Sequence, residues 1–316
     1  MNKFLTTLEH FDSKIDETFT KERASILTNR TIKGDNKINA IKIAISMIDL
    51  TTLEGKDSEG KVFAMCQKAK NPLPGDSNIP HCAAVCVYPH LIRYAKKAVN
   101  NSGVKIASVA TSFPSGQYSL KLKLSDVEKC ITDGADEIDM VISRGEFLSG
   151  NYEYVFNEIF KVKELCKTLS DKQSRRNGKK KEVHLKVILE TGEIETFDNV
   201  RKASILAILA GADFIKTSTG KVQPAATLPV TLVMLNAIKD YYNETGIKIG
   251  MKPAGGIKTT KDAISYLILL NETLGDEWMT PDLFRLGASS VLNDLLMQYK
   301  KQNTGYYQSG DYFSLD

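Results

Sequence analysis

Short apolar runs alternate with longer amphipathic runs along most of this chain, and no other feature of the sequence limits the possible folds as strongly. Eight runs have the length and apolar character of buried strands. These strand candidates are Ile43 to Leu50, Ala83 to Tyr88, Lys105 to Ala110, Glu137 to Ile142, His184 to Glu190, Asp213 to Thr217, Lys248 to Lys252 and Leu283 to Leu286. Helical patterns follow near residues 58–70, 89–102, 120–133, 151–168, 198–210, 227–245, 260–274 and 290–301. Eight consecutive strand–helix units predict an α/β fold of the (β/α)8 TIM-barrel class.

An open, doubly wound parallel sheet is the alternative fold for such an alternation. That fold carries a glycine-rich dinucleotide fingerprint after its first strand. Here the first strand candidate runs into D-L-T-T-L at Asp49 to Leu53, which contains no glycine. The barrel is therefore the favoured prediction.

The barrel would occupy residues 41–301 as a single catalytic domain. Residues 1–40 carry apolar side chains, among them Phe11 and Phe19, near helical spacing. This pattern predicts an N-terminal helical extension that packs on the barrel.

Two further segments fall outside the barrel pattern. The basic segment 171–182, with its run from Arg175 to Lys181, would lie in a helix-to-strand loop as a solvated insertion. Much of the excess positive charge of the chain, formally +4, lies in this run, so the charge does not indicate nucleic-acid binding. Residues 302–316, rich in Tyr, Gly and Ser, are expected to form a mobile C-terminal tail.

Several other classes of protein are disfavoured by the sequence. No apolar run approaches the roughly 20 residues that a membrane helix needs, and the N-terminus lacks the pattern of a secretory signal. We therefore expect a cytoplasmic protein without membrane contact. The five cysteines include no C-x-x-C pair, and the four histidines lie at spacings that do not suit a metal site. We expect neither a disulfide framework nor a bound metal.

Two strand candidates share a motif and end in groups with useful chemistry. The segment G-A-D-F-I-K ends in Lys216 and the segment G-A-D-E-I-D ends in Asp139, each five residues after its glycine. In a barrel the two side chains would lie at matched heights, near the C-terminal face where barrel enzymes carry out catalysis. Lys252, in G-M-K-P, ends the strand that follows Lys216.

A pair of neighbouring buried lysines favours Schiff-base chemistry. Attack on a carbonyl needs the neutral amine, and an ordinary lysine with a pKa near 10.4 is only about 0.04% neutral at pH 7. Burial and the charge of Lys252 would both lower the pKa of Lys216. Asp139, together with Asp49 at the end of the first strand, would supply carboxylates for proton transfer.

Three small-residue turns follow the last three strand candidates. They contribute Gly220 and Lys221 from S-T-G-K, Gly255, Gly256 and Lys258 from P-A-G-G-I-K, and Gly287, Ser289 and Ser290 from G-A-S-S. Glycines allow close approach of backbone amides to an oxyanion, and the loops after strands seven and eight are the usual phosphate site of barrels. We therefore expect a phosphate-binding site at this rim.

Taken together, these stretches resemble the deoxyribose-phosphate aldolase family, class I aldolases of barrel fold. The resemblance runs from about Ile43 to about Asp294. Its most specific parts are D-L-T-T-L, A-V-C-V-Y-P, S-V-A-T-S-F-P-S-G, L-K-V-I-L-E-T-G, F-I-K-T-S-T-G-K, K-P-A-G-G-I and G-A-S-S. It implies the reversible cleavage of 2-deoxy-D-ribose 5-phosphate to D-glyceraldehyde 3-phosphate and acetaldehyde in deoxyribonucleoside catabolism, with no metal and no cofactor.

The resemblance also implies roles for individual residues. Lys216 would form the Schiff base, Asp139 and Lys252 would act through water as the acid–base pair, and Asp49 would support them. The family's phosphate contacts map onto the eight residues of the three turns. Lys258 stands where many relatives carry arginine, which keeps the charge but loses bidentate geometry.

Two other functions stay open at this point. A pyridoxal-phosphate barrel enzyme also combines a lysine imine with a phosphate cradle. A sugar-phosphate-binding scaffold would keep the pocket without turnover. The sequence also leaves open whether Cys86 is a core residue or a thiol that faces the pocket, whether the chain forms a homo-oligomer, and which proteins it contacts.

Overall fold

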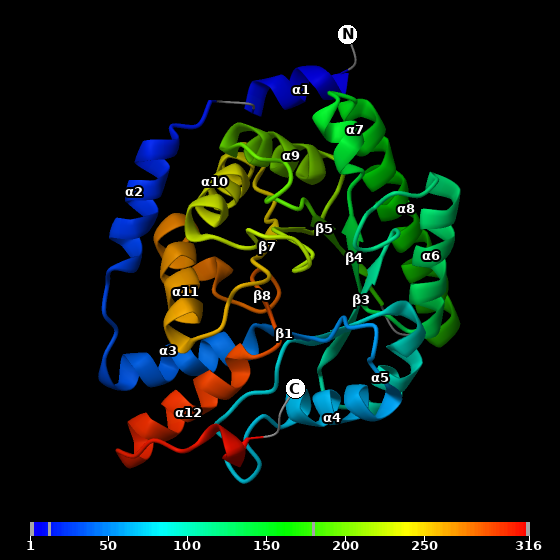
Figure 1. The fold of residues 1–316 in the computed structure, drawn as a ribbon. Coiled ribbons are helices and arrows are strands. Elements are labelled where there is room, and N and C mark those ends of the chain that lie inside the picture. Colours follow the sequence, from blue (N-terminus) through cyan, green and yellow to red (C-terminus); the bar gives the residue numbers. More distant parts are fainter. Residues whose placement is uncertain (1–2, 12–13, 179–180, 314–316) are drawn as a thin grey trace.

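Eight parallel strands form the centre of the molecule and helices surround them (Figure 1). The structure is a computed structural model that describes residues 3–11, 14–178 and 181–313. The strands neighbour one another in the order β7-β6-β5-β4-β3-β2-β1-β8. Isolated bridges from Met251 to Phe284 and from Ala254 to Gly287 join the two ends of this order. The fold is therefore a (β/α)8 TIM barrel.

The strands are short and lie close to their predicted positions. They are β1 (Ile48–Thr51), β2 (Ala84–Val87), β3 (Lys105–Ala110), β4 (Glu137–Val141), β5 (His184–Ile188), β6 (Phe214–Lys216), β7 (Gly250–Lys252) and β8 (Leu286–Ala288). Side chains alternate across each strand. On β4, Ile138 and Met140 join the hydrophobic core under the helices, whereas Glu137 and Asp139 bond to groups inside the barrel.

Helices precede, separate and follow the strands. They are α1 (Lys3–Phe11), α2 (Glu17–Thr28), α3 (Gly34–Ser46), α4 (Glu59–Lys70), α5 (Ile92–Ala98), α6 (Leu120–Asp133), α7 (Arg144–Leu148), α8 (Tyr152–Asn177), α9 (Phe197–Leu209), α10 (Leu228–Thr245), α11 (Thr260–Leu274) and α12 (Val291–Thr304). Short 3-10 turns are η1 (Pro89–Leu91), η2 (Asp276–Trp278) and η3 (Gly310–Tyr312). Local residues mark the helix ends: Gly134 ends α6 with φ of 119°, and Thr259 and Asp262 form a capping box on α11.

The prediction of the first strand, Ile43 to Leu50, was wrong for its first half. Residues 43–46 belong to α3, and β1 begins only at Ile48. The buried side chains Ile41, Ala44 and Ile45 follow helical spacing, but a continuous apolar run does not distinguish a buried helix from a buried strand. The last strand also lies further along the chain than Leu283 to Leu286, since the amides of residues 283 and 284 bond to Thr280 in a turn.

The helical extension lies outside the barrel helices, with α2 alongside α10 and α11 in Figure 1. Leu8, Phe11 and Ala24 are buried against the barrel helices. The backbone carbonyl of Phe11 accepts a hydrogen bond of 3.0 Å from Nε of Arg201 on α9. The extension therefore covers one side of the barrel and continues through α3, past the predicted boundary at residue 40.

The first part of the basic segment 171–182 is helical, whereas the sequence predicted a loop there. Arg175 and Arg176 lie in the last turn of α8, which continues to Asn177, and Gly178 follows with φ of 65°. The pattern from Asp171 onward is polar but rich in helix-forming residues, which explains the longer helix. Lys181 forms a 3.3 Å ion pair with Asp136, whereas residues 179–180 lie outside the described part of the chain.

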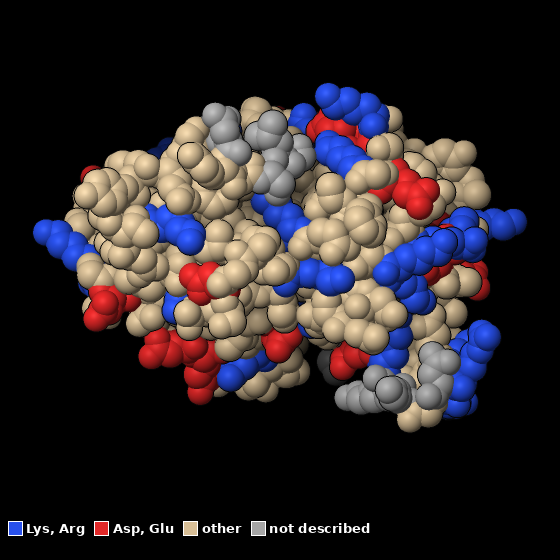
Figure 2. Space-filling view, turned by 90° about the horizontal axis from the view of Figure 1, so that it is seen from below, with Lys and Arg blue, Asp and Glu red and all other residues tan. Residues whose placement is uncertain are grey.

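The predicted tail begins later than residue 302 because α12 extends to Thr304. Phe313, beyond η3, is buried in the main hydrophobic core, and residues 314–316 lie outside the described residues. On the face shown in Figure 2, Lys and Arg side chains are interspersed with Asp and Glu side chains. Among the helices of the described ranges, none is both long and apolar enough to cross a bilayer.

Candidate active site

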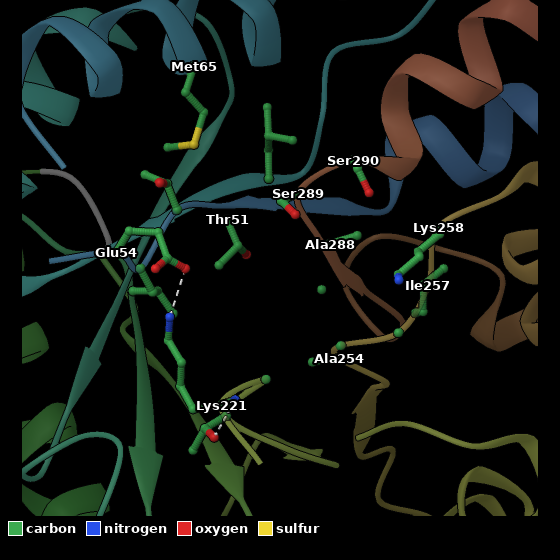
Figure 3. Close-up of a pocket in the computed structure, with 18 of the residues that line it drawn as sticks. Thr51, Glu54, Met65, Lys221, Ala254, Ile257, Lys258, Ala288, Ser289 and Ser290 are labelled. Carbon is green, nitrogen blue, oxygen red and sulfur yellow. Dashed lines mark hydrogen bonds and ion pairs between the residues drawn. The ribbon is translucent and has the colours of Figure 1, made fainter. Parts of the chain in front are cut away.

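A cavity of about 670 Å³ opens at the C-terminal ends of the strands (Figure 3). Loops after β1, β6, β7 and β8 supply most of its wall. Lys216, the last residue of β6, is one of the residues that line it. The cavity therefore combines the C-terminal barrel position, a lysine and the small-residue turns, as the sequence predicted.

Lys216 meets Asp139 inside the barrel. Nζ of Lys216 donates to Oδ2 of Asp139 at 2.8 Å, and Nζ of Lys252 donates to the same oxygen at 2.7 Å. Strand register explains the arrangement, because Lys216 pairs with Lys252 across β6 and β7. All three side chains are almost completely buried. The structure thus brings these three predicted residues together.

Below this triad lies a network of charged groups that sequence reasoning largely missed. Lys186 on β5 contacts Glu137 and donates to Oδ1 of Asp139 at 3.1 Å. Arg285, just before β8, donates to Oδ1 of Asp49 at 2.6 Å and to Oε1 of Glu137 at 2.7 Å. Asp49 also lies 2.6 Å from Nζ of Lys252. The predicted supporting carboxylate is therefore part of the same network.

The network is balanced in charge only when one lysine is neutral. Its fully buried carboxylates are Asp49, Glu137 and Asp139, and its buried cations are Lys186, Lys216, Lys252 and Arg285. The partly exposed Lys105 lies 3.8 Å from Glu137 but is balanced by Asp282, at 3.1 Å. Four positive and three negative groups leave one positive charge in surplus. A buried surplus charge is costly, so one amine is expected to give up its proton.

Lys216 is the lysine best suited to lose that proton. Burial is the main cause that lowers its pKa, and the charge of Lys252 lowers it further, against the opposing effect of Asp139. Burial would also lower the pKa of Lys252, but the carboxylates of Asp139 and Asp49 raise it above its usual value. Lys216 therefore combines contact with the cavity and a lowered pKa.

The carboxylates stay ionised. Burial would raise the pKa of Asp139, but the neighbouring side chains of Lys186, Lys216 and Lys252 outweigh burial and hold this pKa well below its usual value. The same balance, with Arg285 as the largest of the attractive partners, lowers the pKa of Glu137 to about 2. Asp139 is thus an ionised acceptor between two amines.

The predicted phosphate site lies on the wall of the same cavity. All eight residues of the three turns line it: Gly220, Lys221, Gly255, Gly256, Lys258, Gly287, Ser289 and Ser290. Gly255 and Gly256 have φ near 80°, which favours glycine. Ser290 is the N-cap of α12 but makes no capping hydrogen bond with its side chain. The small residues of the turns and the first residues of α12 therefore line the cavity, whereas the amides of Gly255 and Gly287 already donate to the backbone carbonyls of Gly287 and Pro253.

Two lysines of this wall differ in their partners. Nζ of Lys221 forms an ion pair of 2.8 Å with Oε1 of Glu54, on the loop after β1. Among the residues that the structure describes, none forms an ion pair with the exposed Lys258 side chain. Figure 3 shows Lys258 on the side of the cavity opposite the Lys221–Glu54 pair.

Cys86 faces the barrel interior, which the sequence had left open. Its Sγ lies 3.9 Å from Oδ2 of Asp139, and the residue is fully buried. Burial and the nearby Asp139 carboxylate raise the pKa of this thiol to about 11. At neutral pH Cys86 is therefore a thiol beside the reactive groups, and it is not among the residues that line the open cavity.

In the described ranges, no group of three or more His, Cys, Asp or Glu side chains could hold a metal ion. The carboxylates beneath the cavity are instead engaged by lysine and arginine. What this arrangement offers is a buried lysine with a lowered pKa, an ionised carboxylate and a cavity wall of small-residue turns.

Comparison with known proteins gives a consistent result. A family model described as DeoC/LacD family aldolase matches residues 43–271. The deoxyribose-phosphate aldolases of Mus musculus and Homo sapiens are each 44% identical over 292 residues, which cover 89% of this chain and 87% of each relative. A tetrameric deoxyribose phosphate aldolase from Aeropyrum pernix superimposes with a TM-score of 0.63 at 21% identity, over 87% of this chain and 100% of that one. At this identity the structural likeness concerns the fold alone.

Proposed function

The chain belongs to the DeoC/LacD family of aldolases, and from this premise we propose that it cleaves 2-deoxy-D-ribose 5-phosphate reversibly to D-glyceraldehyde 3-phosphate and acetaldehyde. It is then a carbon–carbon lyase of deoxyribonucleoside catabolism. The observation that carries the proposal is Lys216, a buried lysine with a lowered pKa that reaches a cavity walled by three small-residue turns.

Cleavage begins with Lys216. Its neutral amine attacks the aldehyde carbon C1 of the open-chain sugar, and loss of water gives a protonated imine. A base removes the proton of the C3 hydroxyl, the bond between C2 and C3 breaks, and its electrons move into the imine to form an enamine. D-Glyceraldehyde 3-phosphate leaves as the new aldehyde.

The second half of the reaction returns the enzyme to its starting state. One proton reaches C2 of the enamine, and hydrolysis of the resulting imine releases acetaldehyde and Lys216. Asp139, which accepts hydrogen bonds from both lysines, is suited to transfer protons through water. Lys252 keeps its proton and stabilises the Asp139 carboxylate.

The phosphate of the substrate would bind the three turns opposite the imine. Helix N-termini and glycine amides suit its negative charge, and Lys221 and Lys258 add positive charge. We further propose a cytosolic location and a homo-oligomeric state, for which the tetrameric Aeropyrum pernix protein is a precedent within the fold.

Borohydride reduction in the presence of acetaldehyde, followed by peptide mapping, tests the proposal. We expect a covalent adduct on Lys216, and we expect Lys216→Arg to abolish both the adduct and turnover because arginine provides no neutral amine. The adduct should form faster as pH rises, since deprotonation creates the nucleophile, and should reach its maximum below the ordinary lysine pKa of 10.5. An adduct on Lys252 or Lys221, or a protein that binds the sugar phosphate without forming any adduct, would contradict it.

A further inference from the structure

Glu54 is a negatively charged residue in the otherwise positively charged wall of the cavity. Four lysines are among the described residues that line the cavity: Lys61, Lys216, Lys221 and Lys258. Glu54 is the one carboxylate among those lining residues. A wall that is otherwise suited to an anion therefore carries one negative group, and this group is paired with a lysine of the phosphate site.

Both members of this pair are mounted on ordered loops. The amide of Glu54 donates to Oδ2 of Asp57 at 2.9 Å, and Asp57 also accepts from Oγ1 of Thr52 at 2.7 Å. On the other side, the amide of Lys221 donates to Oγ1 of Thr219 at 3.1 Å. Each partner is therefore held by hydrogen bonds within its own loop, and the ion pair joins the loops after β1 and β6.

The ion pair is strong enough to orient Lys221 but weak enough to be exchanged. The side chains of Lys221 and Glu54 are 31% and 56% exposed, and exposed ion pairs contribute little stability. Figure 3 shows the Lys221 side chain extended toward Glu54, on the side of the cavity away from Ser289 and Lys258. A phosphate dianion in the cradle would offer Lys221 a partner of higher charge.

We propose that Glu54 is a specificity-determining residue that holds Lys221 in the empty site and competes with the substrate phosphate for it. Phosphate binding then requires Lys221 to exchange the Glu54 carboxylate for the phosphate oxygens. The chain consequently binds phosphate-bearing ligands more weakly than its lysine-rich wall alone would allow. This inference rests on the proposed function, because it assigns Lys221 to the substrate phosphate.

The first test measures binding of inorganic phosphate by calorimetry at low ionic strength. Glu54→Gln keeps the shape of the side chain and removes the charge, and we expect it to lower the Kd about two- to fivefold, the effect typical of an exposed ion pair. The KM for the phosphorylated sugar should fall by a similar factor.

Glu59→Gln is the matched control, since Glu59 is exposed on the first turn of α4 and does not line the cavity. An unchanged Kd in Glu54→Gln overturns the proposal.

A double-mutant cycle separates competition for Lys221 from simple charge repulsion. Lys221→Met should raise the Kd for phosphate, and in that background Glu54→Gln should change the Kd by much less than it does alone. An equal gain in both backgrounds would mean that Glu54 acts through repulsion only and would overturn the competition. Loss of the aldolase function would appear independently, as absence of the Lys216 adduct in the unmodified protein.

Discussion

At the scale of single residues, the barrel interior holds three lysines, and their surroundings give them different roles. Lys252 contacts two carboxylates and Lys186 contacts three, so the pKa of each is raised despite burial. Lys216 contacts Asp139 alone among the described carboxylates, and its pKa is lowered. The number of carboxylates around each amine therefore explains why Lys216 has the lowered pKa that the proposed nucleophile needs.

This reasoning predicts an unusual phenotype for Asp139→Asn. The Asp139 carboxylate raises the pKa of Lys216, so its removal should leave more neutral amine and preserve adduct formation with borohydride. Proton transfer should suffer instead, and we expect turnover of the phosphorylated sugar to fall about 10²- to 10⁴-fold. Adduct yield and kcat, measured on the same preparation, check the prediction.

A folding control is needed for this variant. Asparagine leaves Lys186 and Lys252 without one of their charge partners, and breaking a buried ion pair costs about 3–5 kcal/mol. Thermal unfolding establishes whether the variant is folded at the assay temperature. In a folded variant, parallel loss of adduct and turnover would show that Asp139 is needed for imine formation itself.

The sequence reveals Lys216 and its two partners, Asp139 and Lys252, better than the rest of the network. Lys216 and Lys252 end their strands and Asp139 lies within β4, all in recognisable motifs, so the parity of each could be predicted. Arg285 lay inside the predicted last strand, Leu283 to Leu286, but it was not singled out as an inward-facing charge. Lys186 lies within L-K-V-I-L-E-T-G. A lysine in an otherwise apolar strand indicates that carboxylates on neighbouring strands pair with it, and this signal could have been used.

At the scale of elements, the turns after β6, β7 and β8 form the wall at which we propose that the substrate phosphate binds. Gly287 lies so close to its neighbours that an added Cβ would be 2.8 Å from Cβ of Ala254 and 3.1 Å from Cε of Lys252. At Gly256, by contrast, an added Cβ would meet nothing nearer than 3.8 Å. Gly256 is therefore the better position for testing phosphate binding without disturbing the amines.

We predict that Gly256→Asp raises the KM for the phosphorylated sugar at least tenfold, because a carboxylate then faces the phosphate. Gly256→Ala is the matched control, since it imposes the same backbone strain at φ of 81° without the charge. Steady-state kinetics with phosphorylated and unphosphorylated deoxyribose measure the effect. Equal KM changes in the two variants would attribute the effect to backbone strain, and equal changes for the two sugars would argue against a phosphate site there.

Element boundaries were predicted well where a cap or turn residue marks them and poorly where only apolar character was available. The helix at Thr260–Leu274 and the strand at Lys105–Ala110 have the predicted bounds. Between Ile41 and Leu50 no glycine or proline separates α3 from β1, and tertiary packing decides where the helix stops.

At the scale of the whole molecule, the N-terminal extension and the cavity involve different parts of the barrel. The cavity is walled by the loops at the C-terminal ends of the strands, whereas α1 and α2 contact α9, α10 and α11 on the outside. Polar contacts reinforce this attachment, including the ion pair between Lys14 and Asp198 at 2.8 Å. The extension is therefore expected to contribute to stability rather than to the chemical step.

Two phenylalanines of the extension provide a matched test of that expectation. Phe11 is 5% exposed and packs near Tyr241 with ring centroids 6.1 Å apart, whereas Phe19 is 57% exposed. Phe11→Ala should lower the free energy of unfolding by about 3–5 kcal/mol, the usual cost of emptying a buried aromatic site. Phe19→Ala should change it by no more than about 0.5 kcal/mol.

Denaturant unfolding measures both values, and kcat below the unfolding transition should match that of the unmodified chain in both variants. Equal stability of the two variants would mean that α1 does not pack on the barrel as described, and a reduced kcat in folded Phe11→Ala would show that the extension influences the active site.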